Sequence, residues 1–454
     1  MSSNKVRLGD LIEVLTDYHA NGAYKKLKEN VELLDDEDYA LMVRTTNFEN
    51  NDFHDSVKYI NEHAYNFLEK SKVYPNDLIM NKIANAGSIY LMPDLQRPVS
   101  LAMNLFLIRI NEKLANPVYV YLYLKINEQY VKQFANGSVT KTITKEAVRN
   151  LEIFIPSRAE QDAIVQQYIA LDNKIKLNLK INQTLESIAQ ALFKSWFIDF
   201  DPVRAKIAAK QERKDPELAA MCIVSGKSEA ELQQIPEEDF AELQATAALF
   251  PDEFVESELG EVPKEWEVKP LDKIANYLNG LALQKFRPEN EYDFLPIVKI
   301  AQLKSGVATI EEKASPNIDR KFIIENGDVI FSWSGSLMVD IWCGGKAALN
   351  QHLFKVTSND YHKWLYYFYT KHHLAEFQRI AQAKAVTMGH IKREHLSQAL
   401  CCIASNQLLE ISNIFIGHFL QKLIELRLEN NNLKQLRDTL LPKLLSGEVE
   451  VENL

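Results

Sequence analysis

The sequence predicts an α+β fold: two similar units, each a mixed sheet with helices, joined by two long antiparallel coiled-coil helices. Two observations lead to this prediction. The same order of strand-like and helix-like segments occurs twice along the 454 residues, and each occurrence is followed by apolar residues at alternating steps of four and three. A repeated segment order indicates a duplicated unit, and a sustained 4-3 spacing indicates the seam of a coiled coil.

Four stretches of the first half recur in the same order about 250 residues later. The first pair, "NDLIMNKIANAGS" and "GDVIFSWSGS", shares an acidic residue after a turn former, three apolar positions and a Gly-Ser loop. The paired ranges are 76–88 with 327–336, 102–110 with 348–356, 118–124 with 363–369, and 138–155 with 385–403. One such match could arise by chance, but four in the same order indicate a duplication.

Within each repeat, short β-branched and aromatic runs end at Gly, Asn or Asp, which is the pattern of strands and their turns. A Tyr-rich amphipathic helix is predicted near 117–135 and again near 361–382. A last strand is predicted at 151–155 and at 399–403. Each repeat is therefore expected to fold as one α+β unit.

A long helix is predicted after each unit, at 157–198 and 405–447. Ten seam positions span 32 steps in each, so each seam is about 48 Å long. Ser157 and Glu160 form a predicted capping box at the start of the first helix, and "SGE" at 446–448 ends the second. The predicted seam residues are Ile164, Tyr168, Leu171, Ile175, Asn178, Asn182, Leu185, Ala189, Leu192 and Trp196 in the first helix, and Ser412, Ile416, Phe419, Leu423, Leu426, Asn430, Leu433, Arg437, Leu440 and Leu444 in the second.

The narrow seam favours a helical partner of equal length, and the other helix of the same chain supplies one. Two alternatives stay open: parallel pairing between two chains, and burial of each stripe against its own unit. Asn182 and Asn430 occupy matched seam positions, and we expect them to meet as a buried polar pair that sets register at a cost in stability. The alternative is that Asn178 and Asn182 face a docked partner.

The chain is divided by these patterns into six parts. They are the first unit (1–156), the first long helix (157–198), an acidic connector (199–260), the second unit (261–404), the second long helix (405–447) and a tail (448–454).

The formal charge is −10, but residues 201–260 alone hold 14 acidic and 6 basic residues, a net of −8. The rest of the chain sums to −2, so net charge does not exclude a nucleic-acid partner.

Other features exclude several protein classes. No apolar run reaches the length of a membrane span, the start lacks the order of a secretion signal, and the four cysteines form no CxxC pair, so a cytoplasmic protein without a metal site is expected. Dinucleotide, P-loop, zinc-protease and serine-hydrolase motifs are absent. Asp77 and Asp328 recur at matched positions and suit strand-turn hydrogen bonds better than acid-base chemistry. The histidines of 372–377 fall within a segment predicted to be a core-packing helix, so no ligand role is expected of them. We expect no catalytic activity from the chain alone.

Two diverged units on a helical spacer suit a target with two different halves, such as major-groove faces about one turn, near 35 Å, apart. Lys and Arg would bind phosphates, and Asn, Gln, Thr, Ser and Arg would read base edges. A solvated polar loop is the alternative for any single residue. The candidate DNA contacts are Lys25, Lys26, Lys28, Arg44, Thr45, Thr46, Asn47, Asn136, Ser138, Thr140 and Lys141 in the first unit, and Lys285, Arg287, Lys299, Gln302, Lys304, Ser332, Ser334, Ser336, Lys384, Thr387 and His390 in the second.

Segments spread over essentially the whole chain resemble the specificity (S) subunit of Type I restriction-modification systems, the HsdS family. The most specific are "SWFIDFDPVRAK" and "ELGEVPKEWEV"; "LEIFIPSRAEQDAIV", "ENGDVIFSWSGS" and "LRDTLLPKLLSGEVEV" agree with them. The chain ends promptly after the last of these, so no role of a longer tail is expected.

The resemblance implies two target recognition domains, each reading one half of an interrupted, asymmetric double-stranded DNA site. It implies that the long helices dock two methyltransferase (M) subunits, which use S-adenosylmethionine to methylate adenine, and that ATP- and Mg-dependent motor-nuclease (R) subunits join them. The chain itself would hold no cofactor and contact no membrane. The connector would pack near the junction of the first long helix and the second unit, away from DNA.

Two other classes are weaker. A stand-alone DNA-binding regulator would use the long helices to dimerise two chains, and would therefore not be a monomer in isolation. A fused methyltransferase-nuclease would need cofactor and (N/D)PP(Y/F) motifs, which this sequence lacks.

Overall fold

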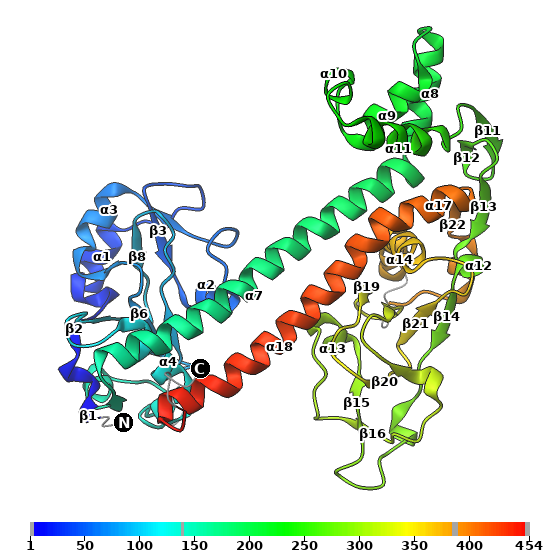
Figure 1. The fold of residues 1–454 in the computed structure, drawn as a ribbon. Helices are drawn as coiled ribbons and strands as arrows, with labels where there is room; N and C mark the ends of the chain where they lie inside the picture. The colour runs from blue at the N-terminus through cyan, green and yellow to red at the C-terminus, as the bar shows by residue number, and fades with distance from the viewer. Residues whose placement is uncertain (1–3, 138–139, 384–388, 450–454) are drawn as a thin grey trace. The chain divides into compact units, whose positions relative to one another are not determined.

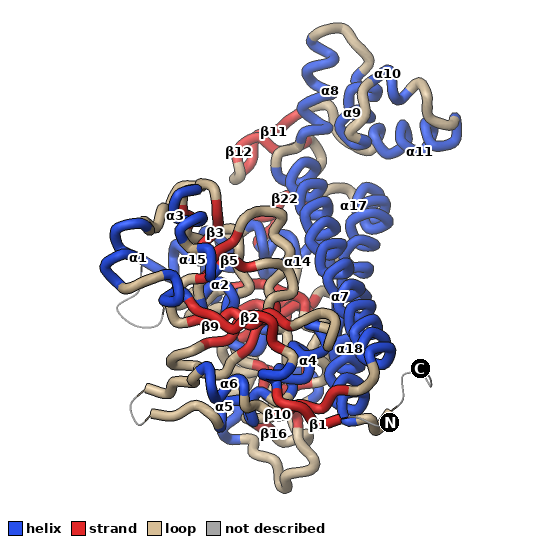
Figure 2. Tube along the Cα trace, turned by 90° about the vertical axis from the view of Figure 1, so that its left-hand side faces the viewer, coloured by secondary structure: helices blue, strands red, loops and turns tan. Residues whose placement is uncertain are grey.

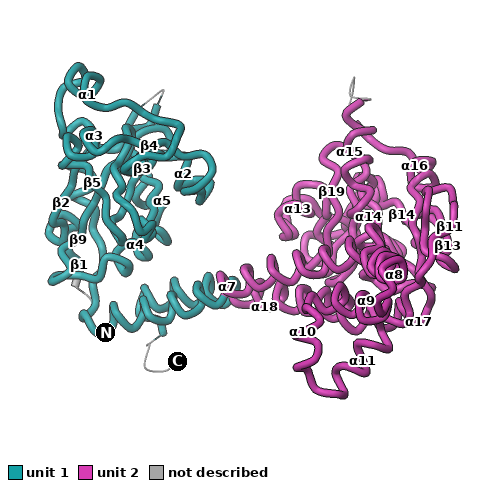
Figure 3. Tube along the Cα trace, turned by 90° about the horizontal axis from the view of Figure 1, so that it is seen from above, with its two compact units in different colours: residues 1–174, 434–454 teal, residues 175–433 magenta. Residues whose placement is uncertain are grey.

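The computed structural model describes residues 4–137, 140–383 and 389–449. The chain forms two compact units: Met1–Lys174 with Lys434–Leu454 (unit 1), and Ile175–Leu433 (unit 2) (Figure 3). Each long helix contributes its two ends to different units. The candidate loops of the first repeat lie in unit 1 and those of the second repeat in unit 2.

Unit 1 contains two four-stranded sheets and a short strand pair (Figure 1). One sheet has the antiparallel order β2 (Ile12–Asp17), β9 (Leu105–Ile110), β6 (Leu78–Asn81), β7 (Ile89–Leu91). The other has the order β4 (Tyr59–Ile60), β3 (Ala40–Val43), β8 (Val99–Leu101), β5 (Lys72–Val73), with β3 and β8 parallel. The strand pair is β1 (Asn4–Arg7) with β10 (Glu152–Ile155). The helices are α1 (Tyr24–Asn30), α2 (Thr45–Asn50), α3 (Glu62–Phe67), α4 (Pro117–Ile126), α5 (Glu128–Gln133) and α6 (Lys145–Arg149).

Unit 2 repeats this arrangement. Its antiparallel sheet has the order β14 (Asn276–Asn279), β21 (Leu353–Thr357), β18 (Val329–Ser332), β19 (Met338–Ile341). Its second sheet has the order β16 (Lys313–Ala314), β15 (Leu295–Val298), β20 (Ala347–Leu349), β17 (Ile323–Ile324), with β15 and β20 parallel. The strand pair is β13 (Glu267–Pro270) with β22 (Leu400–Ile403). The helices are α12 (Leu271–Ile274), α13 (Ile300–Ser305), α14 (Lys363–His372), α15 (Leu374–Ala383) and α16 (Arg393–Gln398). The predicted duplication is confirmed.

The central strands are buried on both faces, because each separates two cores. On β9, Phe106 and Ile108 pack into one cluster, and Leu105 and Leu107 into another. This follows from the two-residue period of a strand, whose successive side chains point to opposite faces. The predicted Tyr-rich helix is broken in both units. In unit 1 the break lies at Asn127, whose side chain donates to Tyr123 O at 2.9 Å.

The two long helices form as predicted. The first is α7 (Arg158–Phe193) with one π-helical turn, η4 (Lys194–Ile198). The second comprises α17 (Asn406–Ser412), a π-helical turn η7 (Asn413–Gly417) and α18 (His418–Ser446). Ser157 and Glu160 make the predicted capping box, in which Ser157 N–H and Oγ both donate to Glu160 Oε2 (2.9 and 2.8 Å). All twenty predicted seam residues are buried or half-buried.

Each unit shows that the helices pair antiparallel within the chain. In unit 1, Arg437 Nη1 lies 3.3 Å from Asp172 Oδ1. In unit 2, Asn178 Nδ2 donates to Asn430 Oδ1 at 3.0 Å. From Asp172 to Asn178 the residue number on α7 rises, while the number of its partner on α18 falls from 437 to 430, as in an antiparallel pair. Both seams are occupied within the chain, so they do not need a second chain as the regulator interpretation required.

The predicted meeting of Asn182 with Asn430 is wrong by one helical turn. Asn430 bonds instead to Asn178 and donates to Ile175 O at 3.3 Å, while Asn178 also donates to Glu429 Oε2 at 2.9 Å. Asn182 is 7% exposed, and its amide nitrogen and oxygen have no hydrogen-bond partner among the described residues. The 4-3 pattern specifies which face is buried, but it leaves the axial offset between the helices open.

The acidic connector folds into a small helical subdomain of unit 2. Its elements are α8 (Asp201–Gln211), α9 (Pro216–Ser225), α10 (Glu229–Leu232) and α11 (Glu237–Ala248), followed by the hairpin β11 (Phe254–Ser257) and β12 (Gly260–Pro263); Figure 2 shows its helices in blue and its hairpin in red. Lys206 is buried and donates to Phe250 O at 2.8 Å. The rings of Trp196 and Phe250 lie 5.4 Å apart, so the connector packs at the end of the first long helix.

Candidate nucleic-acid interface

A carboxylate closes the turn before the central strand in both units. Asp77 Oδ2 accepts from Tyr74 N–H and Asp328 Oδ2 from Glu325 N–H, each at 2.7 Å. Asp77 is 3% exposed and pairs with Arg109, whose Nη2 lies 2.7 Å away. Burial raises the pKa of Asp77, although the guanidinium opposes that rise. The predicted turn role of these two carboxylates is confirmed.

Three loops meet after this strand, and we call the meeting place the loop junction. It joins the loop after β6, the turn before β9 and the loop before α6; unit 2 uses the loops around β18, β21 and α16. In unit 1, Lys82 N–H donates to Asn104 O (2.8 Å) and Ile143 N–H to Lys82 O (3.0 Å). In unit 2, Trp333 N–H donates to His352 O (3.4 Å) and Ile391 N–H to Trp333 O (3.0 Å).

The loop junction brings together several candidates far apart in sequence. In unit 1, Asn136 and Thr142 form an isolated β-bridge, and Thr142 also bridges to Ile83, so exposed Asn136, Thr140 and Lys141 lie beside it. In unit 2, exposed His390 bridges to Ser334. Ser138, Lys384 and Thr387 lie outside the described residues.

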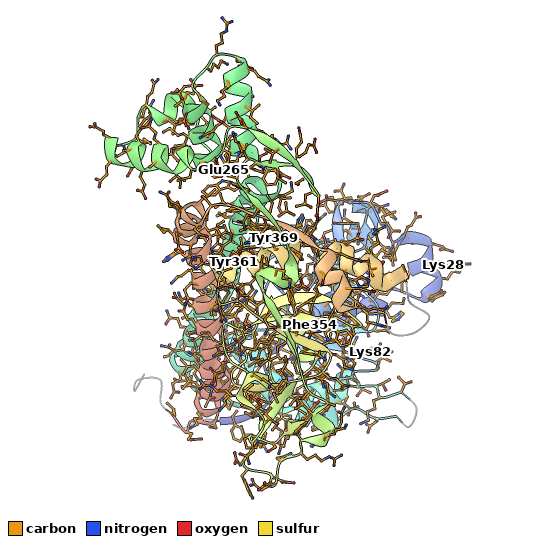
Figure 4. All side chains as sticks on the ribbon, turned by 90° about the vertical axis from the view of Figure 1, so that its right-hand side faces the viewer. Lys28, Lys82, Glu265, Phe354, Tyr361 and Tyr369 are labelled. Carbon is orange, nitrogen blue, oxygen red and sulfur yellow. The ribbon has the colours of Figure 1, made fainter. Side chains whose placement is uncertain are left out.

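A further set of candidates is exposed away from the loop junction. Lys25, Lys26 and Lys28 lie on α1, and Figure 4 labels Lys28 on its ribbon. Lys285 and Arg287 are exposed around the one-turn helix η5 (Leu283–Lys285). These side chains are accessible to a phosphate backbone, as the prediction requires.

One candidate in each unit, Asn47 in unit 1 and Gln302 in unit 2, has the same structural role. Asn47 Oδ1 accepts from Arg44 N–H (2.9 Å), and Gln302 Oε1 accepts from Lys299 N–H (3.2 Å), at the starts of α2 and α13. Asn47 is 1% exposed, and its amide donates to Asp52 O. These bonds satisfy backbone donors at a helix start. Asn47 is therefore a capping residue whose burial argues against base contact.

The remaining candidates divide by burial. Ser332 and Ser334 are buried: Ser332 Oγ donates to Ser334 O at 3.1 Å, and Ser334 Oγ lies 3.0 Å from His352 Nδ1. Both hydroxyls thus shape the loop junction instead of facing solvent. The other candidates are exposed or half-buried, namely Arg44, Thr45, Thr46, Lys299, Lys304 and Ser336.

The site has no arrangement for metal chemistry or membrane insertion in the part of the chain that is described. Within those residues, no group of three or more His, Cys, Asp or Glu side chains could hold a metal ion. No described helix is both long and apolar enough to cross a bilayer. His373 Nε2 lies 3.0 Å from Leu400 O, and burial lowers its pKa to about 4, which agrees with the predicted packing role of this histidine. His372 is exposed, so the packing prediction does not hold for that side chain.

A family model decides the affiliation of the chain. The model described as "Type I restriction modification DNA specificity domain" matches residues 2–187 and 263–437, one match for each repeat with its long helix. The chain belongs to this family. The predicted family and fold class are thereby confirmed, and DNA sequence specificity is the property that the family name implies.

Individual members of the specificity-subunit family agree. The chain is 29% identical over 403 residues to the Type I restriction enzyme HindI specificity subunit of Haemophilus influenzae, covering 84% of this chain and 88% of that one. It is 25% identical to the MjaIX specificity subunit of Methanocaldococcus jannaschii, covering 74% and 69%. The solved structure of the S subunit from M. genitalium matches with a TM-score of 0.53 at 13% identity, covering 98% and 96%, which supports the shared fold.

Proposed function

We propose that this chain is the DNA-specificity subunit of a Type I restriction-modification complex and binds an interrupted, asymmetric site, one half through each unit. The observation that supports this most is the duplicated loop junction: the same backbone hydrogen bonds recur in both units, while the side chains around them differ. Repeated scaffolds with diverged side chains suit a target whose halves differ in sequence. The chain contributes recognition, and its partners contribute chemistry.

The long helices are proposed to dock two methyltransferase subunits, which motor-nuclease subunits join. Apolar side chains outside the seam remain exposed along both helices, and a docked subunit would cover them. They are Ile169, Leu177, Leu179, Ile188, Ile414, Phe415 and Leu436. In this proposal S-adenosylmethionine, ATP and Mg are bound by the partner subunits, and the fixed antiparallel pair holds the two DNA-reading units on one spacer.

Exchange of one unit tests the proposal. The full chain is co-expressed with its neighbouring methyltransferase gene, and methylated adenines are mapped across the host genome. Replacing residues 1–156 by the first domain of another family member should change one half of the methylated sequence and leave the other half intact. Replacing 261–404 should change the opposite half. A change in both halves after either exchange, or in neither, would refute one-half-per-unit reading.

A further inference from the structure

Four positions of the two loop junctions correspond, and strand register relates the first two of them. The last residue of β2, Asp17, lies opposite Phe106, and the last residue of β14, Asn279, lies opposite Phe354. Phe106 and Phe354 are therefore equivalent, and so are Asp17 and Asn279.

The other two positions follow from the loops. Lys82 is the first residue after β6 and Trp333 the first after β18, and each carbonyl accepts the equivalent N–H described above. Lys145 and Arg393 are the first residues of α6 and α16. We call Asp17, Phe106, Lys82 and Lys145 the unit 1 cluster, and Asn279, Phe354, Trp333 and Arg393 the unit 2 cluster. Figure 4 labels one member of each, Lys82 and Phe354.

The unit 1 cluster is ionic. Asp17 Oδ2 lies 3.2 Å from Lys82 Nζ and 3.5 Å from Lys145 Nζ, and both amines stand over the Phe106 ring, 5.5 and 5.9 Å from its centroid. Asp17 is 8% exposed, whereas the Lys82 and Lys145 side chains are 28% and 39% exposed. One buried anion thus orients two accessible cations, which leaves a net positive charge at the surface.

The unit 2 cluster is aromatic. Trp333 Nε1 donates to Asn279 Oδ1 at 3.0 Å, and the indole lies 5.8 Å from the Phe354 ring. Arg393 stands over the same ring at 5.5 Å, and its Nη2 donates to Tyr277 O at 3.0 Å. Asn279, at the end of β14, thus holds Trp333 as Asp17 holds Lys82, but Trp333 presents a half-buried ring where Lys82 presents an ammonium group.

Two of the four positions are similar in the unit 1 and unit 2 clusters, and two differ. Both clusters have a phenylalanine in the strand and a cationic side chain at the helix start, as a shared scaffold requires. The other two positions differ as a pair. In unit 1 the carboxylate of Asp17 holds the amine of Lys82, and in unit 2 the amide of Asn279 holds the indole of Trp333. The exchange alters the group that each loop junction presents to solvent, an ammonium group in unit 1 and an indole in unit 2, while the ring and the cation beside it are kept.

We propose that Lys82 and Trp333 are equivalent specificity-determining residues for the two half-sites, with Asp17 and Asn279 as their positioning residues. The inference rests on the proposed function. Lys82 donates to an acceptor of a guanine edge, for which an ammonium group is suited, with Lys145 on the adjacent phosphate. Trp333 makes an apolar contact with a base, as ring faces and thymine methyl groups permit. One unit therefore reads through a charge and the other through a ring.

The half-site sequence and the salt dependence of binding together test these roles. The full chain is purified with its methyltransferase partner, and its affinity is measured for duplexes carrying the mapped site, at several salt concentrations. Lys82→Gln should relax the sequence of the first half-site, whereas Lys145→Gln should reduce the slope of log affinity against log salt by about 1 without changing that sequence. Trp333→Leu should weaken binding roughly tenfold, relax the second half-site and leave the slope unchanged.

Matched variants keep the outcome interpretable. Lys82→Arg retains a cationic donor for a guanine edge and should keep the sequence of the first half-site, and Lys227→Gln in the connector should change nothing. Thermal melting identifies any variant that fails to fold, and for such a variant Lys82→Met or Trp333→Met takes its place. Unchanged half-site sequences in folded Lys82→Gln and Trp333→Leu complexes would overturn the inference while leaving one-half-per-unit reading intact. If the exchange of residues 1–156 alters neither half, the proposed function itself fails.

Discussion

Units 1 and 2 have the same sheets, the same turn carboxylate and the same loop-junction hydrogen bonds, yet they differ in the groups they present. Asp77 is held by a guanidinium and Asp328 by an ammonium group, in Lys355, at 2.7 Å. Asp17 is held between two lysines where Asn279 holds an indole. Backbone geometry in this fold is therefore maintained by turns and strand register, which leaves the side chains of the loop junction free to differ.

The turn carboxylates give the largest expected difference between the units. Arg109→Ala leaves Asp77 buried without its cation, so we expect a loss of about 4 kcal/mol in the free energy of unfolding. Lys355→Ala uncovers the more exposed Asp328 and should cost about 1 kcal/mol. Urea unfolding of both variants measures the difference. Arg379→Ala, which removes a surface pair with Glu376, is the control. Equal losses at Arg109 and Lys355 would show that the two turns are energetically alike.

Acid should destabilise unit 2 more than unit 1. At the helix break where unit 1 has Asn127, unit 2 has His373, whose pKa is lowered by burial to about 4. A base with a lowered pKa in the folded state contributes its full stability above its ordinary pKa near 6.5, and loses it as the pH falls toward 4. We expect a loss of about 3 kcal/mol over this window.

Hydrogen exchange at pH 7, 5.5 and 4, resolved by segment, measures this acid effect. Protection in α14 and β22 should fall with pH, while protection in α4 and β10 changes less. His373→Asn copies unit 1 at this position and should flatten the pH dependence of α14. A parallel fall of protection in both units would contradict the assignment to His373.

Asn182 and Asn430 occupy matched positions of the repeat in the two long helices, and their replacement should change stability in opposite directions. Asn430→Leu removes two buried hydrogen bonds and should destabilise the chain by about 1–2 kcal/mol. Asn182→Leu replaces a buried amide that lacks a partner within the described chain and should stabilise it by about 1 kcal/mol. Urea denaturation of the two single variants tests this, and effects of the same sign would be inconsistent with pairing through Asn178.

Features of short range could be predicted well from the sequence. The 4-3 spacing identified all twenty seam residues as buried or half-buried, and Ser157 with Glu160 marked the start of α7. The candidate contacts could be predicted less well. Asn47 and Gln302 stand in polar loops, as a base reader would, but their side chains cap helices, and Ser332 and Ser334 are buried. A polar residue in a loop can bond to its own backbone or face solvent, and composition does not distinguish the two.

Lys82 and Lys145 were missed for a related reason. Each is an ordinary surface lysine in sequence, and neither lies near Asp17 along the chain. Their equivalence to Trp333 and Arg393 follows from their places directly after β6 and β18 and at the starts of α6 and α16. Their nearness to Asp17 and Asn279 follows from the pairing of β2 with β9 and of β14 with β21. A signal was present in the aligned segments 76–88 and 327–336, where Lys82 and Trp333 follow equivalent strands.

The sequence by itself determined the duplication, the seam face of each long helix and the helix start at Ser157, because these depend on residue spacing and local hydrogen bonds. The tertiary structure decided that Asn178, not Asn182, meets Asn430, and that Asp17 orients Lys82 while Asn279 orients Trp333. The physical reason is the same in both cases. An axial offset between helices or a register between strands depends on how whole surfaces pack, and no local pattern in either segment records it.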